Sequence, residues 1–130
     1  MKTLFLVEDN QDNADLITDL IGDFYHLTWF PDGPSVLAAL TAEDASLPDL
    51  LLLDISLPGM DGRSLLRNIR SHKHLKQIPA VALTAHAMKT DKESFISIGF
   101  NAYLSKPITD EQLLLDTIEA HTTQSVRAAA

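Results

Sequence analysis

The sequence predicts a single-domain α/β protein in which a parallel β-sheet carries helices on both faces. Five short apolar runs alternate with five stretches of helical periodicity along 130 residues, of which 45% are hydrophobic. Each apolar run stops at polar or turn-forming residues, and no internal repeat or low-complexity tract breaks the order. Strands that are separated by helices pair in parallel through right-handed crossovers, which places helices on both sides of the sheet.

The chain begins with a predicted strand, Thr3–Val7, in which only the first residue is not apolar. A helix is predicted over residues 11–24, and Asn10 is placed to cap its first turn through a side-chain oxygen. The apolar residues of this helix recur at helical spacing: Ala14, Leu16, Ile17, Leu20, Ile21 and Phe24.

The middle of the chain contains two further strands. Residues 27–30 predict the second strand, residues 31–33 a turn, and residues 35–41 a helix. Residues 50–53 are four consecutive leucines that end at Asp54. A short apolar run without alternation is typical of a strand that is buried on both faces, and flanking prolines favour a strand over a helix here. The inward face of the second helix is predicted to comprise Val36, Leu37 and Leu40.

The second half of the chain continues the alternation. A loop leads into a helix over residues 64–70, and the apolar run 78–83 predicts the fourth strand. Residues 88–98 predict a helix that Gly99 ends, and residues 102–104 predict the fifth strand. The last helix is predicted from residue 110 to about 121, which gives a domain over 1–121 and a flexible tail over 122–130. The inward positions predicted for the third and fifth helices are Leu65, Leu66, Ile69, Leu113, Leu114 and Ile118.

Composition narrows the class of protein. No apolar stretch approaches the roughly 18 residues that a membrane span needs, and Glu8 and Asp9 interrupt the first apolar run too early for a signal peptide. With no cysteine the chain has neither a disulfide framework nor a thiolate metal site, and nothing indicates secretion, so we expect a cytoplasmic protein without membrane insertion. A net charge of −8 disfavours nucleic-acid binding. The acidic residues either keep the protein soluble or cluster around a cation.

Polar side chains follow four of the predicted strands at the point where each strand ends. These are Glu8 and Asp9 after the first strand, Asp54 after the third, Thr84 after the fourth and Lys106 after the fifth. In an open parallel sheet, ligands bind beyond the carboxyl ends of the strands. The topology therefore predicts that three carboxylates, a hydroxyl and an ammonium meet at one edge.

Three clustered carboxylates repel one another unless a cation joins them, and Mg²⁺ with oxygen ligands fits such a site. A carboxylate beside Mg²⁺, a lysine and a hydroxyl can receive a phosphoryl group, with Asp54 as the nucleophile and Thr84 and Lys106 beside it. Each residue also has a simpler interpretation, as a helix-start acid, a turn residue, a cap or a surface lysine. The placement of all these residues at one edge of the sheet favours a site for Mg²⁺ and a phosphoryl group over the simpler interpretations.

Four segments resemble the receiver domains of two-component response regulators, and the resemblance extends over nearly the whole chain, from about residue 3 to 121. They are LFLVEDN at 4–10, PDLLLLDISLPGMDG at 48–62, LTAHAMK at 83–89 and YLSKPI at 103–108. The resemblance implies a flavodoxin-like (βα)5 fold with a five-stranded sheet of order 2-1-3-4-5.

The resemblance also implies the roles of individual residues. Asp54 would accept a phosphoryl group from a phosphohistidine, and Thr84 and Lys106 would contact the phosphoryl oxygens. Tyr103 would turn toward the space that Thr84 leaves, and this role is compatible with a half-buried strand aromatic whose hydroxyl faces water. The peptide bond before Pro107 would be cis. The implied Mg²⁺ ligands are Asp9, Asp54 and the backbone carbonyl of Ser56, with Glu8 acting through water.

The implied partners are a sensor histidine kinase or a histidine phosphotransfer protein, and a downstream protein that the sequence does not identify. The donor is expected to dock at the start of the first helix, with Asn13, Ala14 and Ile17 as candidates, although Ile17 is equally a core residue. The readout surface is expected over residues 88–98, the last strand and the last helix. His86 and Ser56 depart from the common pattern, and His86 either faces solvent or contacts a phosphoryl oxygen or an attacking water.

No output domain follows the last helix, so the chain is expected to act as a stand-alone receiver that binds a partner or relays its phosphate. The opening motif and residues 87–89 resemble receivers of hybrid kinases and relay proteins. Met1 just before the first strand favours a native start, and a receiver cut from a longer protein is the alternative.

Three rival functions fit parts of the sequence less well. A phosphatase of the haloacid-dehalogenase type also uses a strand-end Asp, Mg²⁺ and a lysine, but it needs an acid where this chain has Ser56, and usually a cap domain. A receiver-like scaffold that is never phosphorylated tends to lack one of the site residues, all of which are present. Flavin binding is disfavoured because no phosphate-binding loop follows the first strand.

Overall fold

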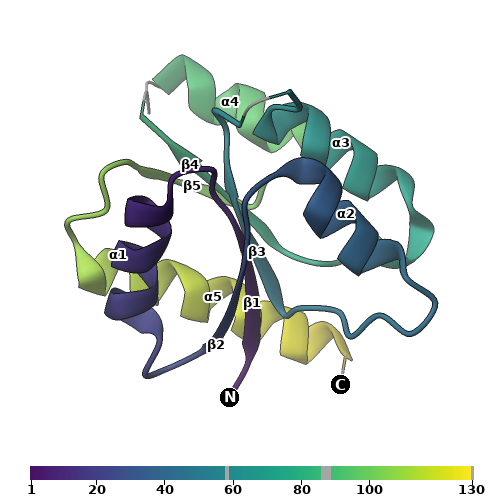
Figure 1. Cartoon of the computed structure of the whole chain (residues 1–130), viewed down its shortest axis with the longest axis horizontal. Coiled ribbons are helices and arrows are strands. Elements are labelled where there is room, and N and C mark those ends of the chain that lie inside the picture. The colour runs from purple at the N-terminus through teal and green to yellow at the C-terminus, as the bar shows by residue number, and fades with distance from the viewer. Residues whose placement is uncertain (58, 86–88, 130) are drawn as a thin grey trace.

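The protein is a three-layer α/β sandwich around a five-stranded parallel sheet (Figure 1). The computed structural model describes residues 1–57, 59–85 and 89–129, with the side chains of 89–93 and 123–129 left out. The strands are β1 (Thr3–Val7), β2 (His26–Phe30), β3 (Leu50–Asp54), β4 (Ala80–Thr84) and β5 (Ala102–Ser105). The helices are α1 (Gln11–Ile21), α2 (Gly33–Thr41), α3 (Gly62–Ser71), α4 (Lys89–Ile98) and α5 (Glu111–Ala129), with a short 3-10 turn at Lys73–Leu75.

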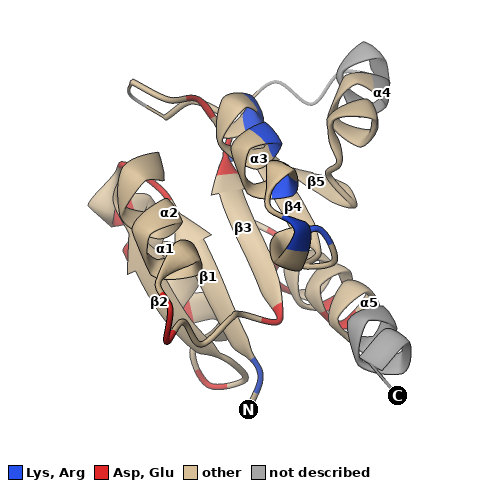
Figure 2. Ribbon diagram, turned by 90° about the vertical axis from the view of Figure 1, so that its right-hand side faces the viewer, with Lys and Arg blue, Asp and Glu red and all other residues tan. Residues whose placement is uncertain are grey.

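The strands pair in the order β2-β1-β3-β4-β5, so the predicted flavodoxin-like topology is confirmed. All strands are parallel, and their carboxyl ends meet at one edge of the sheet, which lies at the top of Figures 1 and 2. The central strand β3 is fully buried, as its four leucines predicted. Asp54 is the last residue of β3, and Figure 2 shows the tip of β3 at this upper edge in the colour of acidic residues.

The core consists of two apolar layers, one on each face of the sheet. Helices α2, α3 and α4 cover one layer, in which Val36, Leu65 and Phe95 are buried. Helices α1 and α5 cover the other layer with Ile17 and Ile118. Helices on both faces are the arrangement that buries an all-parallel sheet. No described helix combines the length and the hydropathy that crossing a membrane requires.

Local signals explain where the helices begin. The side chain of Asn10 accepts a hydrogen bond from the Asn13 N–H, which confirms the predicted cap of α1. Asp32 and Asp61 cap α2 and α3 in the same way, so both helices begin before their predicted starts. The predicted start of α4 at Met88 lies outside the described residues.

Two predicted helix ends were wrong. Helix α1 ends at Ile21, because Gly22 has low helix propensity and its N–H closes the last turn on the Thr18 carbonyl. Helix α5 runs to Ala129, where the sequence predicted an end near His121, because no glycine or proline follows to stop it. Whether residues 122–130 belong to the domain stays a prediction.

One predicted inward position was also wrong, and two apolar residues that recur at helical spacing near α1 are exposed. Leu113 is 53% exposed, Phe24 is 53% exposed and Leu16 is 39% exposed. Phe24 lies beyond the end of α1, so the helical spacing no longer decides which way it faces. Leu16 and Leu113 each precede an inward residue, Ile17 and Leu114, and one helical step of about 100° turns them away from the core.

Candidate phosphoacceptor site

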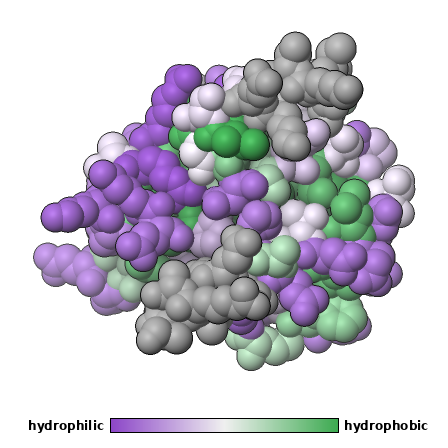
Figure 3. Space-filling model, turned by 180° about the vertical axis from the view of Figure 1, so that it is seen from behind, coloured by the Kyte–Doolittle hydropathy of each residue, from purple (hydrophilic) through white to green (hydrophobic). Residues whose placement is uncertain are grey.

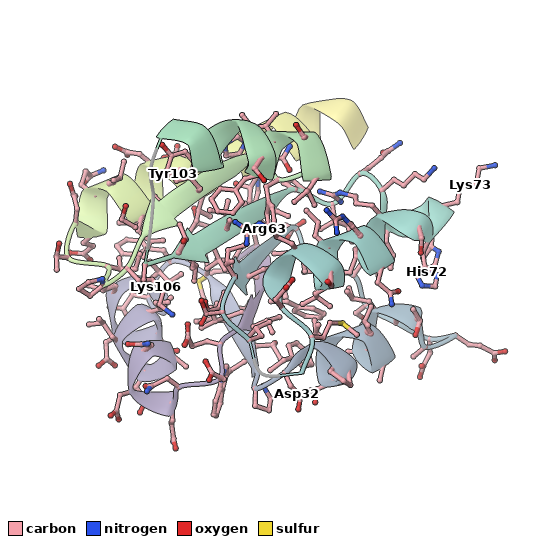
Figure 4. The ribbon with its side chains drawn as sticks, turned by 90° about the horizontal axis from the view of Figure 1, so that it is seen from above. Asp32, Arg63, His72, Lys73, Tyr103 and Lys106 are labelled. Carbon is pink, nitrogen blue, oxygen red and sulfur yellow. The ribbon has the colours of Figure 1, made fainter. Side chains whose placement is uncertain are left out.

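The structure brings the predicted strand-end residues together at the upper edge of the sheet. Glu8 and Asp9 follow β1, Asp54 ends β3, Thr84 ends β4 and Lys106 follows β5. Figure 4 looks down onto this edge and shows Lys106 between α1 and the end of β5. Because β1, β3 and β4 are neighbours in the sheet, residues far apart in sequence become adjacent here.

The three carboxylates form a tight cluster. One oxygen each from Glu8, Asp9 and Asp54 lies within 4.8 Å of the others. Glu8 is 0% and Asp54 is 1% exposed, whereas Asp9 is open to solvent. Buried carboxylates at this separation require compensating positive charge, and a hard divalent cation reached from the open Asp9 side fits the oxygen donors that are present.

Lys106 supplies positive charge from the opposite side. Its Nζ lies 2.8 Å from Asp54 Oδ2 and 3.2 Å from Glu8 Oε2, so one ammonium pairs with two buried carboxylates. The backbone N–H of Lys106 donates to the Thr84 carbonyl at 2.8 Å, which ties the lysine to the end of β4. The Lys106–Pro107 peptide bond is cis, the isomer that the resemblance implied.

The mutual electrostatics shift two pKa values. Burial raises the pKa of the Glu8 carboxyl, the charge of Asp54 raises it further, and Lys106 opposes both. Burial lowers the pKa of the Lys106 ammonium, but its hydrogen bonds and charge interactions with Asp54 and Glu8 outweigh burial, so the net shift is upward. The lysine therefore stays charged, and the acidic cluster remains short of positive charge.

Backbone and amide donors hold the two buried carboxylates in place. The Ser56 N–H donates to Asp54 Oδ1 at 2.9 Å, while Asp54 Oδ2 accepts from Lys106. Glu8 Oε1 accepts from Asn13 Nδ2 and from the Asn10 N–H, both at 3.3 Å. Sequence reasoning named Asn13 only as a docking residue, and its contact with Glu8 was missed because it depends on the path of the chain between β1 and α1.

The remaining predicted residues lie around this centre. Thr84 is buried, with 5% exposure, and Tyr103 is half-buried with its ring centroid 6.0 Å from that of Phe95. Ala14 and Ile17 are each only 2% exposed, so they belong to the core and the prediction that they form a docking surface was wrong. His86 lies outside the described residues.

Comparison with known proteins identifies the family. The family model described as "Response regulator receiver domain" matches residues 4–119. The chain belongs to this family. Receiver domains of this family are signalling switches that take phosphoryl groups from histidine kinases, so a dehalogenase-type phosphatase is disfavoured.

Two curated relatives are a response regulator and a sensor histidine kinase. The chain is 36% identical over 121 residues to the polar-differentiation response regulator DivK of Brucella ovis, covering 92% of this chain and 95% of DivK. It is 40% identical over 116 residues to the sensor histidine kinase GacS of Pseudomonas protegens, covering 82% of this chain. The chain spans only 12% of the length of GacS.

Solved receiver domains share the fold. The receiver domain of the sensor histidine kinase PA1611 from Pseudomonas aeruginosa superposes with a TM-score of 0.79 at 32% identity, covering 94% of this chain and 98% of that one. That crystal structure contains a magnesium ion coordinated in its active site cleft.

Proposed function

We propose that this receiver domain accepts a phosphoryl group on Asp54 in a Mg²⁺-dependent reaction and thereby changes its partner-binding surface. The observation that carries the proposal is the single ammonium of Lys106, which pairs with both Asp54 and Glu8 inside a cluster of three carboxylates. One ammonium leaves that cluster negatively charged. The open Asp9 side is where a cation and a phosphoryl donor can enter.

The residues of the cluster fit a Mg²⁺ ion. Asp9, Asp54 and the backbone carbonyl of Ser56 would hold it, and Glu8 would act through water. The exposed position of Asp9 and the magnesium ion in the PA1611 receiver support this assignment. When bound, the ion supplies positive charge that neutralises phosphoryl oxygens in the transition state.

The chain's own residues account for the remaining chemistry. A carboxylate oxygen of Asp54 forms a bond to phosphorus while the phosphorus–nitrogen bond of the donor phosphohistidine breaks, and the electron pair stays on the imidazole. Lys106 and the Thr84 hydroxyl would contact the transferred oxygens. The Ser56 N–H and the Lys106 ammonium orient the nucleophile before it reacts. Hydrolysis of the acyl phosphate would return the carboxylate, and we propose no activity on other substrates.

We place the readout surface on α4, β5 and α5. Figure 3 faces this side of the molecule and shows hydrophobic side chains among polar ones. Ile96 of α4 and Leu113 of α5 are each 53% exposed, and a groove of about 380 Å³ lies between β5 and α5. Tyr103 lines this groove and lies in the strand next to the one that ends at Thr84, so a shift at Thr84 can reach it.

The proposed phosphodonor is a histidine kinase or a histidine phosphotransfer protein, in line with the names of the two relatives. Asn13 and the exposed Leu16 at the start of α1 flank the open side of the site and are the proposed docking residues. We also propose a cytoplasmic location and no direct contact with nucleic acid, since the net charge is −8. Fractionation of cells would test the location.

Acetyl phosphate with Mg²⁺ tests the function directly. Intact-mass spectrometry is expected to detect one phosphate adduct on the wild-type protein, and none on Asp54→Asn or after EDTA treatment. Asp12→Asn, an exposed acid on α1, is the matched control and should retain the adduct. An adduct on Asp54→Asn would place the acceptor elsewhere, no adduct on the wild type would favour an unphosphorylated scaffold, and turnover of p-nitrophenyl phosphate would favour a phosphatase.

A further inference from the structure

The only tryptophan of the chain lies next to the acidic cluster. Trp29 belongs to the edge strand β2, and its side chain is 38% exposed. The indole Nε1 donates a hydrogen bond of 2.6 Å to the backbone carbonyl of Glu8. Tryptophan combines a large apolar ring with one polar donor, so a specific partner for that donor fixes the orientation of the whole ring.

This hydrogen bond lies at the carboxyl end of β1, where the backbone pairing of β1 with β2 ends. The paired register of β1 and β2 ends with Val7 opposite Phe30. One further backbone bond follows, from the Glu8 N–H to the Phe30 carbonyl at 3.1 Å. The Glu8 carbonyl accepts its hydrogen bond from the Trp29 indole. Trp29 and Phe30, which are consecutive in β2, therefore bind the carbonyl and the N–H of Glu8, respectively.

The carbonyl that Trp29 holds belongs to the peptide group joining Glu8 to Asp9. The Glu8 side chain has its own partners in Asn13 and Lys106. Asp9 is exposed, and its carboxylate has no hydrogen bond among the residues that the structure describes. Within the described part of the chain, Asp9 thus has no side-chain hydrogen bond to orient it, whereas the peptide group that precedes it is held by Trp29.

We infer that Trp29 is a positioning residue for the metal site: its indole N–H fixes the Glu8–Asp9 peptide so that the Asp9 carboxylate faces Glu8 and Asp54. The inference rests on the proposed function, since it assigns Trp29 to the same Mg²⁺ site. Groups that orient metal ligands without touching the metal commonly change affinity by about 10- to 100-fold when they are removed.

A simpler role for Trp29 is to cover the edge of the sheet, with its N–H merely satisfied. That role predicts a loss of stability without a specific loss of Mg²⁺ affinity. Two variants separate these effects. Trp29→Phe removes the donor and part of the ring, whereas 3-benzothienylalanine at position 29 replaces N–H by sulfur and retains the bicyclic shape. Thr28→Val, an exposed substitution on the same strand, is the matched control.

Isothermal titration with MgCl₂ measures the affinity, and thermal unfolding in EDTA measures the stability. We expect about tenfold weaker Mg²⁺ binding in both Trp29 variants, with unchanged affinity in Thr28→Val. The benzothienylalanine protein should unfold close to the wild-type temperature. In the wild type, the emission of Trp29 should change along the same titration curve.

Wild-type affinity in the benzothienylalanine protein would overturn the inference and leave the proposed function intact. Weaker binding in the Thr28→Val control to the same extent would also overturn it, because the effect would then be a general response of β2. A wild-type protein that does not bind Mg²⁺ at all would instead remove the metal site from the proposed function, and the role of Trp29 with it.

Discussion

Gly62, the first residue of α3, lies directly against the backbone of Asp54. A Cβ atom at position 62 would come within 2.8 Å of the Ile55 Cα and even closer to the Asp54 carbonyl oxygen. The Gly62 N–H also donates to the Ile55 carbonyl at 2.9 Å. The start of α3 therefore packs on the residue that we propose as the phosphoacceptor, and only glycine allows that approach.

Gly62→Ala is expected to destabilise the protein by roughly 2 kcal/mol, because the atoms that it would strike are backbone atoms that cannot turn away. Gly33→Ala is the matched control, since Gly33 is also the first residue of a helix after a capping aspartate. Its Cβ would meet the flexible Met60 Sδ at 3.1 Å, so it should cost well under about 1 kcal/mol. Urea unfolding measures the stability of both variants. Equal losses of stability in Gly62→Ala and Gly33→Ala would contradict the proposed clash with the backbone.

The ammonium of Lys106 is expected to support stability as well as chemistry. Lys106→Met keeps most of the length of the side chain but leaves the buried acids Asp54 and Glu8 without a cationic partner, at a cost of roughly 3 kcal/mol in the absence of divalent cations. Added Mg²⁺ should restore part of this loss by supplying positive charge to the same carboxylates.

Urea unfolding with and without MgCl₂ measures both effects. Lys73→Met is the control, because Lys73 is exposed and makes no ion pair within the part of the chain that the structure describes. A Lys106→Met protein as stable as the wild type in EDTA would show that the two ion pairs contribute nothing to the fold.

Much of the site could be predicted from sequence because its chemistry follows directly from strand ends. Asp54 and Lys106 each lie at the carboxyl end of an apolar run, and parallel topology alone brings such positions to one edge. The roles of Ser56 and Tyr103 came from family resemblance, and they stay predictions.

Contacts between side chains and distant backbone groups could not be predicted. The half-buried guanidinium of Arg70 donates to the carbonyls of Leu75, Ile78 and Gly99 and so ties α3 to the α4–β5 turn. Nothing in the periodicity of α3 distinguishes Arg70 from its exposed neighbour Arg67. The contact of Trp29 with Glu8 was missed for the same reason, since it joins the side chain of a β2 residue to the backbone of Glu8, one residue beyond the last paired residue of β1.

The raised pKa of Glu8 predicts a pH-dependent stability in the absence of divalent cations. Between the usual value of 4.5 and the raised value, the folded state holds a proton at Glu8 that the unfolded state has lost. The free energy of unfolding must therefore fall as pH rises through this window. The stability that protonated Glu8 contributes is fully present below pH 4.5, and it is lost once the pH exceeds the raised pKa.

Glu8→Gln removes this titration while keeping a similar shape. The difference in unfolding free energy, wild type minus Glu8→Gln, is expected to decrease as pH rises above 4.5 in EDTA. Urea unfolding at several pH values measures it. A difference that stays constant, or that increases with pH, would show that the pKa of Glu8 is not raised.

An aromatic contact connects α3 to the proposed readout surface. The Arg63 guanidinium lies over the Phe95 ring, 4.9 Å from its centroid, and Phe95 in turn packs on Tyr103. Figure 4 shows Arg63 and Tyr103 on the side of the molecule that α3 and α4 cover. Arg63 thus restrains the Phe95 ring, which packs against Tyr103. Removal of the Arg63 side chain should therefore allow Tyr103 to change rotamer.

Arg63→Ala is expected to cost about 1 kcal/mol and to shift the NMR ring signals of Phe95 and Tyr103 before any phosphorylation. Arg67→Ala, one turn further along α3 and exposed, should change neither the stability nor those signals. With beryllofluoride and Mg²⁺ as a phosphoryl mimic, the Tyr103 signals of Arg63→Ala should move less than those of the wild type. The reason is that Tyr103 is already free to change rotamer in this variant. Identical shifts in both proteins would mean that Arg63 does not restrain Tyr103.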